Sequence, residues 1–163
     1  MQAGVLYPLV TTDGVHFTGA LAQNASLQED LDLPAAVGAG GSGRCRIRSA
    51  IFWSSQNLDW EFQVYSKYNA TSADPNQDSF CGRWAWIAGD GSQIGGAGLW
   101  RYYIDGLDIL YQDEDFEGSG LPPNPPGMAK IHLLLVNRNA TAKFAYGFGN
   151  VRLRLNLEPV FGG

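Results

Sequence analysis

Apolar and polar residues alternate along much of this chain, and the alternation is clearest near the C-terminal end. The segment VRLRLNLEPV, residues 151–160, places four apolar residues on one side of an extended backbone and four polar residues on the other. The apolar side consists of Val151, Leu153, Leu155 and Leu157, and the polar side consists of Arg152, Arg154, Asn156 and Glu158. Successive side chains of a strand point to opposite faces, so this pattern predicts a half-buried antiparallel strand.

The same period of two, or a short apolar run between turn residues, recurs and gives about ten predicted strands. They lie within residues 5–10, 15–22, 44–53, 59–68, 83–89, 98–104, 107–112, 130–137, 143–148 and 151–160. Turn dipeptides such as Asp90-Gly91 separate several of them. One segment, SLQEDLDL at 26–33, instead predicts a short helix, because Ser26 and Glu29 have the spacing of a capping box.

Many strands without ordinary amphipathic helices between them predict an all-β fold, and we expect an antiparallel β-sandwich that is jelly-roll-like. The length of 163 residues fits one domain. Within it, residues 44–163 are expected to form the body, and residues 1–43 an irregular N-terminal arm that ends in the glycine-rich loop AAVGAGGSG. An aromatic content of 12% and 21 glycines agree with strands joined by tight turns.

The net charge, the apolar runs and the cysteines limit the kinds of partner that we expect and the redox state of the thiols. A formal net charge of -5 argues against nucleic acid as a partner, because phosphate binding needs a surplus of Lys and Arg. The chain starts without the pattern of a signal peptide and contains no apolar run of about 18 residues, so we expect no membrane partner. Cys45 and Cys81 are expected to be two buried free thiols rather than a disulfide.

No catalytic motif occurs, so we expect neither an enzyme nor a bound cofactor or metal. The two histidines, His16 and His132, lie inside predicted strands and are interpreted as structural or surface residues. Acids crowd into residues 105–117, where Asp113 and Asp115 could contribute to a Ca²⁺ site, but a solvated acidic loop is the favoured interpretation. Two distant carboxylates acting on a glycan stay open as an alternative.

Aromatic residues of two predicted strands offer a candidate binding surface. Trp84 and Trp86 share one strand face, as do Trp100 and Tyr102, so paired strands could present a flat platform on which a sugar stacks. The alternative, which we favour, is that these rings belong to the core, where each buries about 150–250 Å². A residue such as Arg83, on the opposite face, suits solvent and leaves the rings facing inward.

The irregular N-terminal third, the glycine-rich β-body, the acidic balance and the final strand VRLRLNLEPV resemble the small jelly-roll decoration, or cement, proteins on the capsids of tailed bacteriophages. The resemblance implies a structural virion protein that is made in the host cytoplasm, lies on the capsid surface, assembles as a homotrimer and binds the major capsid protein. The same plan fits a receptor-binding tip domain or a carbohydrate-binding module with a glycan partner, or an unrecognised glycan-acting enzyme.

The N-terminal segment is apolar enough to need a partner in either case. Its candidate assembly residues are Val5, Leu6, Tyr7, Phe17 and Leu21. Because leaving such side chains in water is unfavourable, we expect part of residues 1–33 either to add a strand to the body or to pack on a neighbouring subunit. The glycines at 38–43 would then act as the hinge between arm and body.

Overall fold

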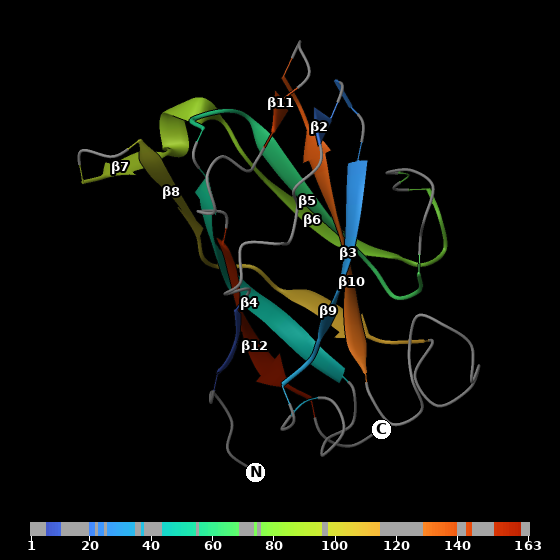
Figure 1. The fold of residues 1–163 in the computed structure, drawn as a ribbon. Coiled ribbons are helices and arrows are strands. Elements are labelled where there is room, and N and C mark those ends of the chain that lie inside the picture. The colour runs from blue at the N-terminus through green and yellow to red at the C-terminus, as the bar shows by residue number, and fades with distance from the viewer. Residues whose placement is uncertain are drawn as a thin grey trace.

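Two antiparallel sheets packed as a sandwich make up the protein (Figure 1), and this confirms the predicted fold class. The computed structural model describes residues 6–10, 20–21, 23–24, 26–34, 37, 44–54, 56–68, 74, 76–95, 98–114, 129–139, 143–144 and 152–160. In these stretches the chain forms β-strands and one short 3-10 turn, η1 (Ala88–Asp90), but no α-helix. Among the same residues no helix is long and apolar enough to cross a membrane.

The larger sheet has six strands in the order β1-β12-β4-β8-β7, with β9 also paired to β4. These strands are β1 (Tyr7–Val10), β4 (Arg44–Ser54), β7 (Ser92–Ile94), β8 (Leu99–Ile104), β9 (Ile109–Gln112) and β12 (Arg152–Pro159). The long strand β4 pairs with β9 through its first half and with β8 through its second half. In Figure 1, β7 and β8 extend to one side of the molecule.

The smaller sheet has four strands in the order β3-β10-β5-β6. These strands are β3 (Ser26–Asp32), β5 (Trp60–Tyr65), β6 (Phe80–Trp86) and β10 (Lys130–Asn137). Two short strands, β2 (Ala20–Leu21) and β11 (Lys143–Phe144), pair separately with each other. The chain passes directly from one sheet to the other after β3, after β4, after β6 and after β9, so residues far apart in sequence meet in the core.

The alternation of the sequence becomes the two faces of each strand. In β12, Leu153 and Leu155 are fully buried, whereas Arg154 between them is exposed, as predicted. The neighbouring strand β4 contains a bulge at Arg48, because Leu157 pairs with Ile47 while Asn156 pairs with Ser49. The extra residue resets the alternation, and the residues on both sides of the bulge can send their apolar side chains into the core.

Aromatic rings fill the centre of the space between the sheets. Phe52 of β4 meets Phe62 of β5 edge-on, with ring centroids 5.1 Å apart. Phe52 also stacks on Trp86 at 6.3 Å, and Phe62 stacks on Trp84 at 5.5 Å. Since Phe52 belongs to one sheet and the other three rings to the opposite sheet, the contacts of Phe52 with Phe62 and Trp86 join the two layers directly.

The helix predicted at 26–33 is wrong. Ser26–Asp32 forms the edge strand β3 and pairs residue by residue with β10, from Val136 opposite Ser26 to Lys130 opposite Asp32. The segment has a period of two as well as a capping-box spacing, and Leu31 enters the core while Asp32 is exposed. Pairing along the whole of β10 and burial of Leu31 outweigh a weak local preference for a helical turn.

Parts of the N-terminal region belong to the sandwich. Of the two alternatives for residues 1–33, the structure shows the first for β1 and β3, each of which adds a strand to a sheet. Leu9 and Val37 are core residues, although Val37 lies inside the glycine-rich segment that was expected to be flexible. The expected hinge at 38–43 and most of the strand predicted at 15–22 lie outside the described residues.

Candidate functional site

The predicted platform of aromatic rings lies in the core. Trp84 and Trp86 are 3% exposed and Tyr102 is fully buried, while Trp100 is partly buried against the core cluster. The ring faces of Trp84 and Trp86 are covered by aromatic residues of the core, so a sugar has no flat surface to stack on there. The alternation that sends Arg83 outward is the reason, and it favours the core interpretation.

Tyr102 shows what its buried position requires of a polar group. Its hydroxyl donates to Asn57 Oδ1 at 2.7 Å and accepts from the Leu58 N–H at 2.8 Å. Burial raises the pKa of Tyr102 to about 12, so the phenol stays protonated and acts only as a hydrogen-bonding group. The residue therefore anchors the loop after β4 and takes no part in a binding surface.

His132 lies at the centre of a buried cluster of charged side chains. Its Nδ1 lies 2.7 Å from Asp30 Oδ1, and its Nε2 lies 3.1 Å from Asp113 Oδ1. The side chains of His132 and Asp113 are 0% exposed, and that of Asp30 is 14% exposed. Sheet register explains one contact, because His132 on β10 lies directly opposite Asp30 on β3. Asp113 follows β9 and also accepts the Lys130 N–H at 2.8 Å.

The two carboxylates change the acid–base behaviour of the histidine. Burial alone favours the neutral ring, but the hydrogen bonds and negative charges of Asp113 and Asp30 outweigh burial and raise the pKa of His132 to about 9. At neutral pH the imidazolium is therefore the main form. Catalytic histidines need a nucleophile or substrate within reach, whereas these side chains are closed to solvent. The cluster ties β3, β10 and the end of β9 together.

Asp113 and Asp115 were the candidate ligands of a Ca²⁺ site. Both oxygens of Asp113 have protein partners, namely His132 and the Lys130 N–H, while Asp115 lies outside the described residues. In the part of the chain that the structure describes, no three His, Cys, Asp or Glu side chains gather as metal ligands would. The favoured interpretation of a solvated acidic loop is wrong for Asp113 itself, because this carboxylate is buried.

Polar side chains near His132 on the outer face of the four-stranded sheet are buried as well. Glu61 is 6% exposed, and Gln63 and Tyr65 are fully buried. Gln63 donates to Glu61 Oε2 at 2.6 Å, and the Tyr65 hydroxyl donates to Gln63 Oε1 at 2.5 Å. Arg138 Nη2 donates to the same Glu61 oxygen at 2.6 Å. The part of this face around Glu61, Gln63 and Tyr65 is therefore closed and internally hydrogen-bonded, which leaves little of it for a ligand.

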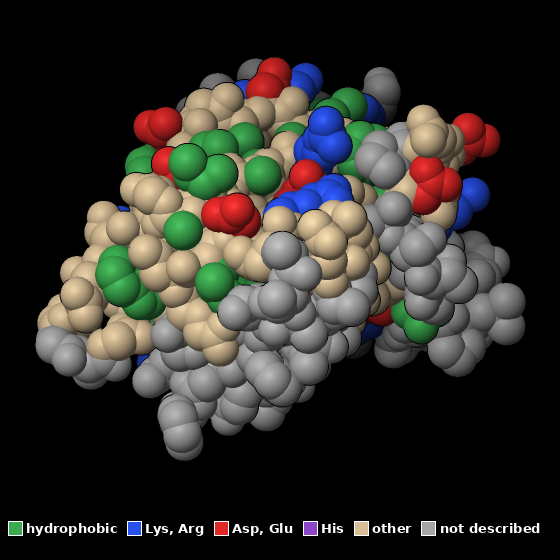
Figure 2. All heavy atoms as spheres, turned by 90° about the horizontal axis from the view of Figure 1, so that it is seen from above, with side chains coloured by type: hydrophobic (Ala, Val, Ile, Leu, Met, Phe, Trp, Pro, Cys, Tyr) green, Lys and Arg blue, Asp and Glu red, His purple; other side chains and the backbone are tan. Residues whose placement is uncertain are grey.

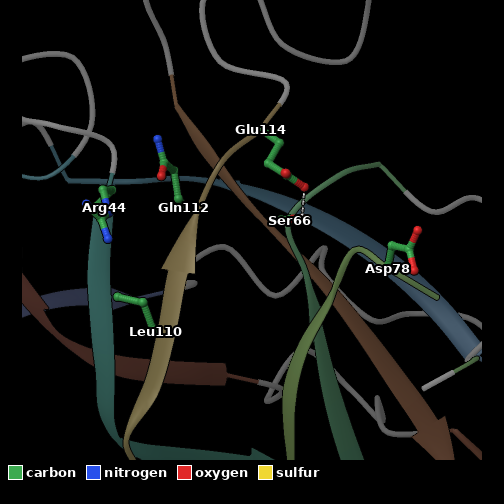
Figure 3. A pocket seen from close by; sticks show the side chains of 6 residues that line it. All are labelled: Arg44, Ser66, Asp78, Leu110, Gln112 and Glu114. Carbon is green, nitrogen blue, oxygen red and sulfur yellow. Dashed lines mark hydrogen bonds between the residues drawn. The ribbon is translucent and has the colours of Figure 1, made fainter. Parts of the chain in front are cut away.

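A polar hollow of about 220 Å³ lies beside the end of β9 (Figure 3). Its lining residues are Arg44, Ser66, Asp78, Leu110, Gln112 and Glu114. The Ser66 hydroxyl donates to Glu114, as the dashed line in Figure 3 marks, so part of the lining is already satisfied. The hollow is open to solvent and has little apolar surface, unlike the enclosed apolar pockets that hold small molecules.

The outer face of the six-stranded sheet is different, because arginines line it and two of them are paired. Arg46 and Arg48 both contact Asp108 Oδ1, at 2.9 and 2.8 Å. Arg48 also contacts Glu158 at 2.6 Å. The hydrogen bond from Arg48 to Glu158 is the main reason why the pKa of Arg48 is raised. At this end of the face the positive charge is therefore balanced.

At the other end of the same face, two cross-strand rows carry arginines beside aromatic and aliphatic side chains. The first row runs Arg152, Trp53, Arg101 across β12, β4 and β8, and the second runs Arg154, Ile51, Tyr103 across the same strands. We call these six residues the arginine face. All three arginines are exposed, Tyr103 is 50% exposed, and Trp53 and Ile51 are half-buried.

The arginines of this arginine face make few contacts within the chain. Arg101 lies over the ring of Tyr103, with Cζ 5.9 Å from the ring centroid. Arg154 Nε donates to Asn156 Oδ1 at 3.2 Å. Within the stretches that the structure describes, no carboxylate lies within 4 Å of these three arginines, in contrast to Arg46 and Arg48. The arginine face is therefore a small cationic surface on an acidic protein.

Other exposed apolar side chains lie on several elements, and one of them, Val10 at 43% exposure, lies opposite Arg154 beside the arginine face. Figure 2 shows a face on which apolar groups lie among charged ones and do not form one continuous patch. Of the candidate assembly residues, Leu6 is 44% exposed and Tyr7 packs on the core, while Val5 and Phe17 lie outside the described residues. Leu21 lies in β2, where only its backbone is described.

The two cysteines are free thiols, as predicted. Cys45 is buried and Cys81 is half-buried, so the expectation of two buried thiols is correct only for Cys45. Burial raises the pKa of Cys45 to about 12 and that of Cys81 to about 11, and the nearby second thiol adds to the effect at Cys45. Both groups are therefore protonated and unreactive at neutral pH.

No family model and no curated protein matches the chain. Among solved structures, the infectious bursal disease virus VP2 subviral particle is similar with 13% identity and a TM-score of 0.26, covering 96% of this chain. A structure of the infectious bursal disease virus Gt strain is similar with 11% identity and a TM-score of 0.21, covering 97%. The chain spans 42% of each of those chains. These resemblances are weak and assign neither a family nor a role.

Two features of the candidate sites were not found from the sequence. The first is the cluster of Asp30, His132 and Asp113. Asp30 and His132 are 102 residues apart in the sequence and meet only because their strands are paired. A histidine inside the apolar run KIHLLLVN was its only signal. The arginine face was visible only in part, as the polar side of VRLRLNLEPV, because the rows depend on which strands lie next to β12.

Proposed function

We propose that this protein is a non-enzymatic structural protein that acts by assembling with other proteins, as a decoration protein does on the surface of a phage capsid. The arginine face is the observation that carries the proposal. Protein interfaces are enriched in Arg, Trp and Tyr, and this face presents three arginines beside Trp53 and Tyr103 on three neighbouring strands.

The rigidity of the sandwich supports the same proposal. The rows of the arginine face belong to β12, β4 and β8, whose opposite faces send Leu153, Leu155, Phe52 and Tyr102 into the core. A surface held in this way needs little ordering when it docks, so less of the binding free energy is lost to entropy. This is the physical property that a protein clamping a lattice requires.

Analytical ultracentrifugation and sedimentation with capsids test this proposal. We expect the full-length protein to be an oligomer, a trimer if it follows the decoration proteins that the sequence resembles, and to sediment with capsids that lack their own decoration protein. The control is the same capsid with those sites already filled, which should retain much less protein. A strictly monomeric protein that sediments with neither capsid would refute the proposal.

A further inference from the structure

We infer that the arginine face docks a protein surface that bears carboxylates, and this inference rests on the proposed assembly function. The pairing of the arginines on this face of the sheet supports the inference. Arg46 and Arg48 on the same sheet face each have an acidic partner, whereas Arg101, Arg152 and Arg154 have none among the described residues. Guanidinium groups bind carboxylates in a bidentate geometry, so these three exposed guanidinium groups suit a partner that presents carboxylates.

The size of the arginine face and its mixture of arginines with aromatic side chains fit the centre of a protein interface. At about 4.8 Å between neighbouring strands, three strands span roughly 10 Å, and the two rows lie about 7 Å apart along the strands. Such an area is smaller than the roughly 800 Å² that a stable partner covers, so other contacts must surround it. Trp53 and Tyr103 lie beside the arginines and would exclude water from their ion pairs, which strengthens each pair.

Nucleic acid fits the arginine face less well than protein carboxylates do. The formal net charge of the chain is -5, and without these three arginines it would be -8. A phosphate backbone continues with one charge every few ångströms, so it would leave the small cationic area and run over acidic surface. The carboxylates of a protein can instead be confined to the matching area, which avoids this repulsion.

A second copy of the chain docked through the same face is also disfavoured. In a two-fold symmetric contact the same patch meets itself, so arginines would lie against arginines. Like charges placed together in this way oppose association. The arginine face is therefore not expected to meet itself, and the proposal assigns it to a different, acidic protein.

The first experiment measures binding of a defined acidic probe. A peptide of alternating glutamate and serine is titrated against the full-length protein at low and high salt, and a peptide of alternating glutamine and serine serves as the neutral control. We expect binding of the glutamate peptide alone, weakening as salt is raised. Replacing Arg101, Arg152 and Arg154 together by Gln should weaken it by about tenfold or more.

A matched variant separates local from general charge effects. Arg83→Gln removes one exposed arginine from the outer face of the other sheet, where it lies 4.0 Å from Glu61, and should change binding by less than about twofold. Arg154→Gln removes one charge from the arginine face and should weaken binding several-fold more than Arg83→Gln does. Near-UV circular dichroism of each variant checks that the fold is retained. Equal effects of Arg83→Gln and Arg154→Gln would overturn the inference.

Two further outcomes would also overturn it. Tighter binding of single-stranded DNA than of the glutamate peptide, lost in the triple Gln variant, would reassign the arginine face to phosphate. Capsid binding that is equally strong in the wild type and in the triple variant would leave the proposed function standing and refute only the acidic partner. Conversely, a monomer that ignores capsids but binds the glutamate peptide through the three arginines would refute the proposed function and keep the chemistry of the arginine face.

Discussion

The outer faces of the two sheets treat polar side chains in opposite ways. On the four-stranded sheet, Glu61, Gln63 and His132 are almost or fully buried, and each is hydrogen-bonded to a neighbour. On the six-stranded sheet, Arg152 and Arg154 are exposed and have no acidic partner among the described residues. One face is therefore part of the folded interior, and the other is open to other molecules.

Alternation along a strand shows which face of the strand is apolar, but it does not show whether protein or solvent covers the polar face. The outer faces of the two sheets differ in this respect. A buried polar group must be satisfied within the protein, since leaving one unpaired costs several kcal/mol. An exposed arginine has water as a partner and contributes little to folding. The two faces should therefore respond differently to mutation, with stability changing at one and binding at the other.

The largest effect is expected from His132→Ala. The substitution leaves Asp113, which is fully buried, and Asp30 without their shared cation, and breaking a buried ionic cluster in this way costs about 3–5 kcal/mol. The free energy of unfolding, measured by urea denaturation, should fall by this amount. A fall of less than about 1 kcal/mol would mean that the outer face of the four-stranded sheet is not a closed part of the interior.

Leu155→Ala should have the next largest effect. Leu155 is fully buried in β12 and packs between the sheets, so its loss leaves a cavity that costs about 2–5 kcal/mol. Urea denaturation of this variant, with Arg154→Ala as the neighbouring control on the other face, measures the difference directly. If the two variants lost equal stability, the register of β12 against β4 would be wrong.

The pH dependence of stability provides a third test of the buried face. The pKa of His132 is about 9 in the folded protein and about 6.5 when unperturbed, so the folded state holds the proton more tightly. The resulting stabilisation is fully present below about pH 6.5 and is lost as the pH rises through about 9. At 1.36 kcal/mol for each unit of difference between the two pKa values, the stabilisation amounts to about 3 kcal/mol.

Urea denaturation repeated between pH 6 and pH 10 measures this change, and His132→Asn is the matched variant. We expect the stability of the wild-type protein to fall across this interval and that of His132→Asn to change much less. Above about pH 9 the cysteines add a fall of their own, because unfolded thiols ionise there while burial holds the folded pKa of Cys45 at about 12 and that of Cys81 at about 11. Both proteins share the cysteines, so the difference between the two curves isolates His132. Parallel pH curves for the two proteins would show that His132 does not carry the effect.

Much of the fold could be predicted from the sequence because strand alternation is a local property. The segment VRLRLNLEPV gave β12 with its correct buried side, and the run KIHLLLVN gave β10. The segment at 26–33 failed because a capping-box spacing and an alternating pattern coincide there, and only pairing with β10 decides between them. A short window of sequence contains no information about long-range pairing. Here the pairing with β10 stabilises a strand where the local pattern predicted a short helix.

The candidate sites were less predictable for the same reason. Trp84 and Trp86 share a strand face in the sequence, but whether that face is core or solvent depends on the sheet packed against it. The contact between Asp30 and His132 depends on the register of β3 against β10. The arginine face likewise exists only because β12, β4 and β8 are neighbours in one sheet.

The smallest effect on stability is expected from Arg154→Ala. Arg154 is exposed on β12, its Nε donates to Asn156 Oδ1 at 3.2 Å, and it lies opposite Val10 and Ile51. Removing an exposed side chain of this kind changes the free energy of unfolding by no more than about 0.5 kcal/mol. Arg48→Ala, which breaks contacts with Asp108 and Glu158, should be more destabilising than Arg154→Ala. Urea denaturation of both variants tests this, and a loss at Arg154 larger than at Arg48 would show that the arginine face is needed for folding and is not reserved for a partner.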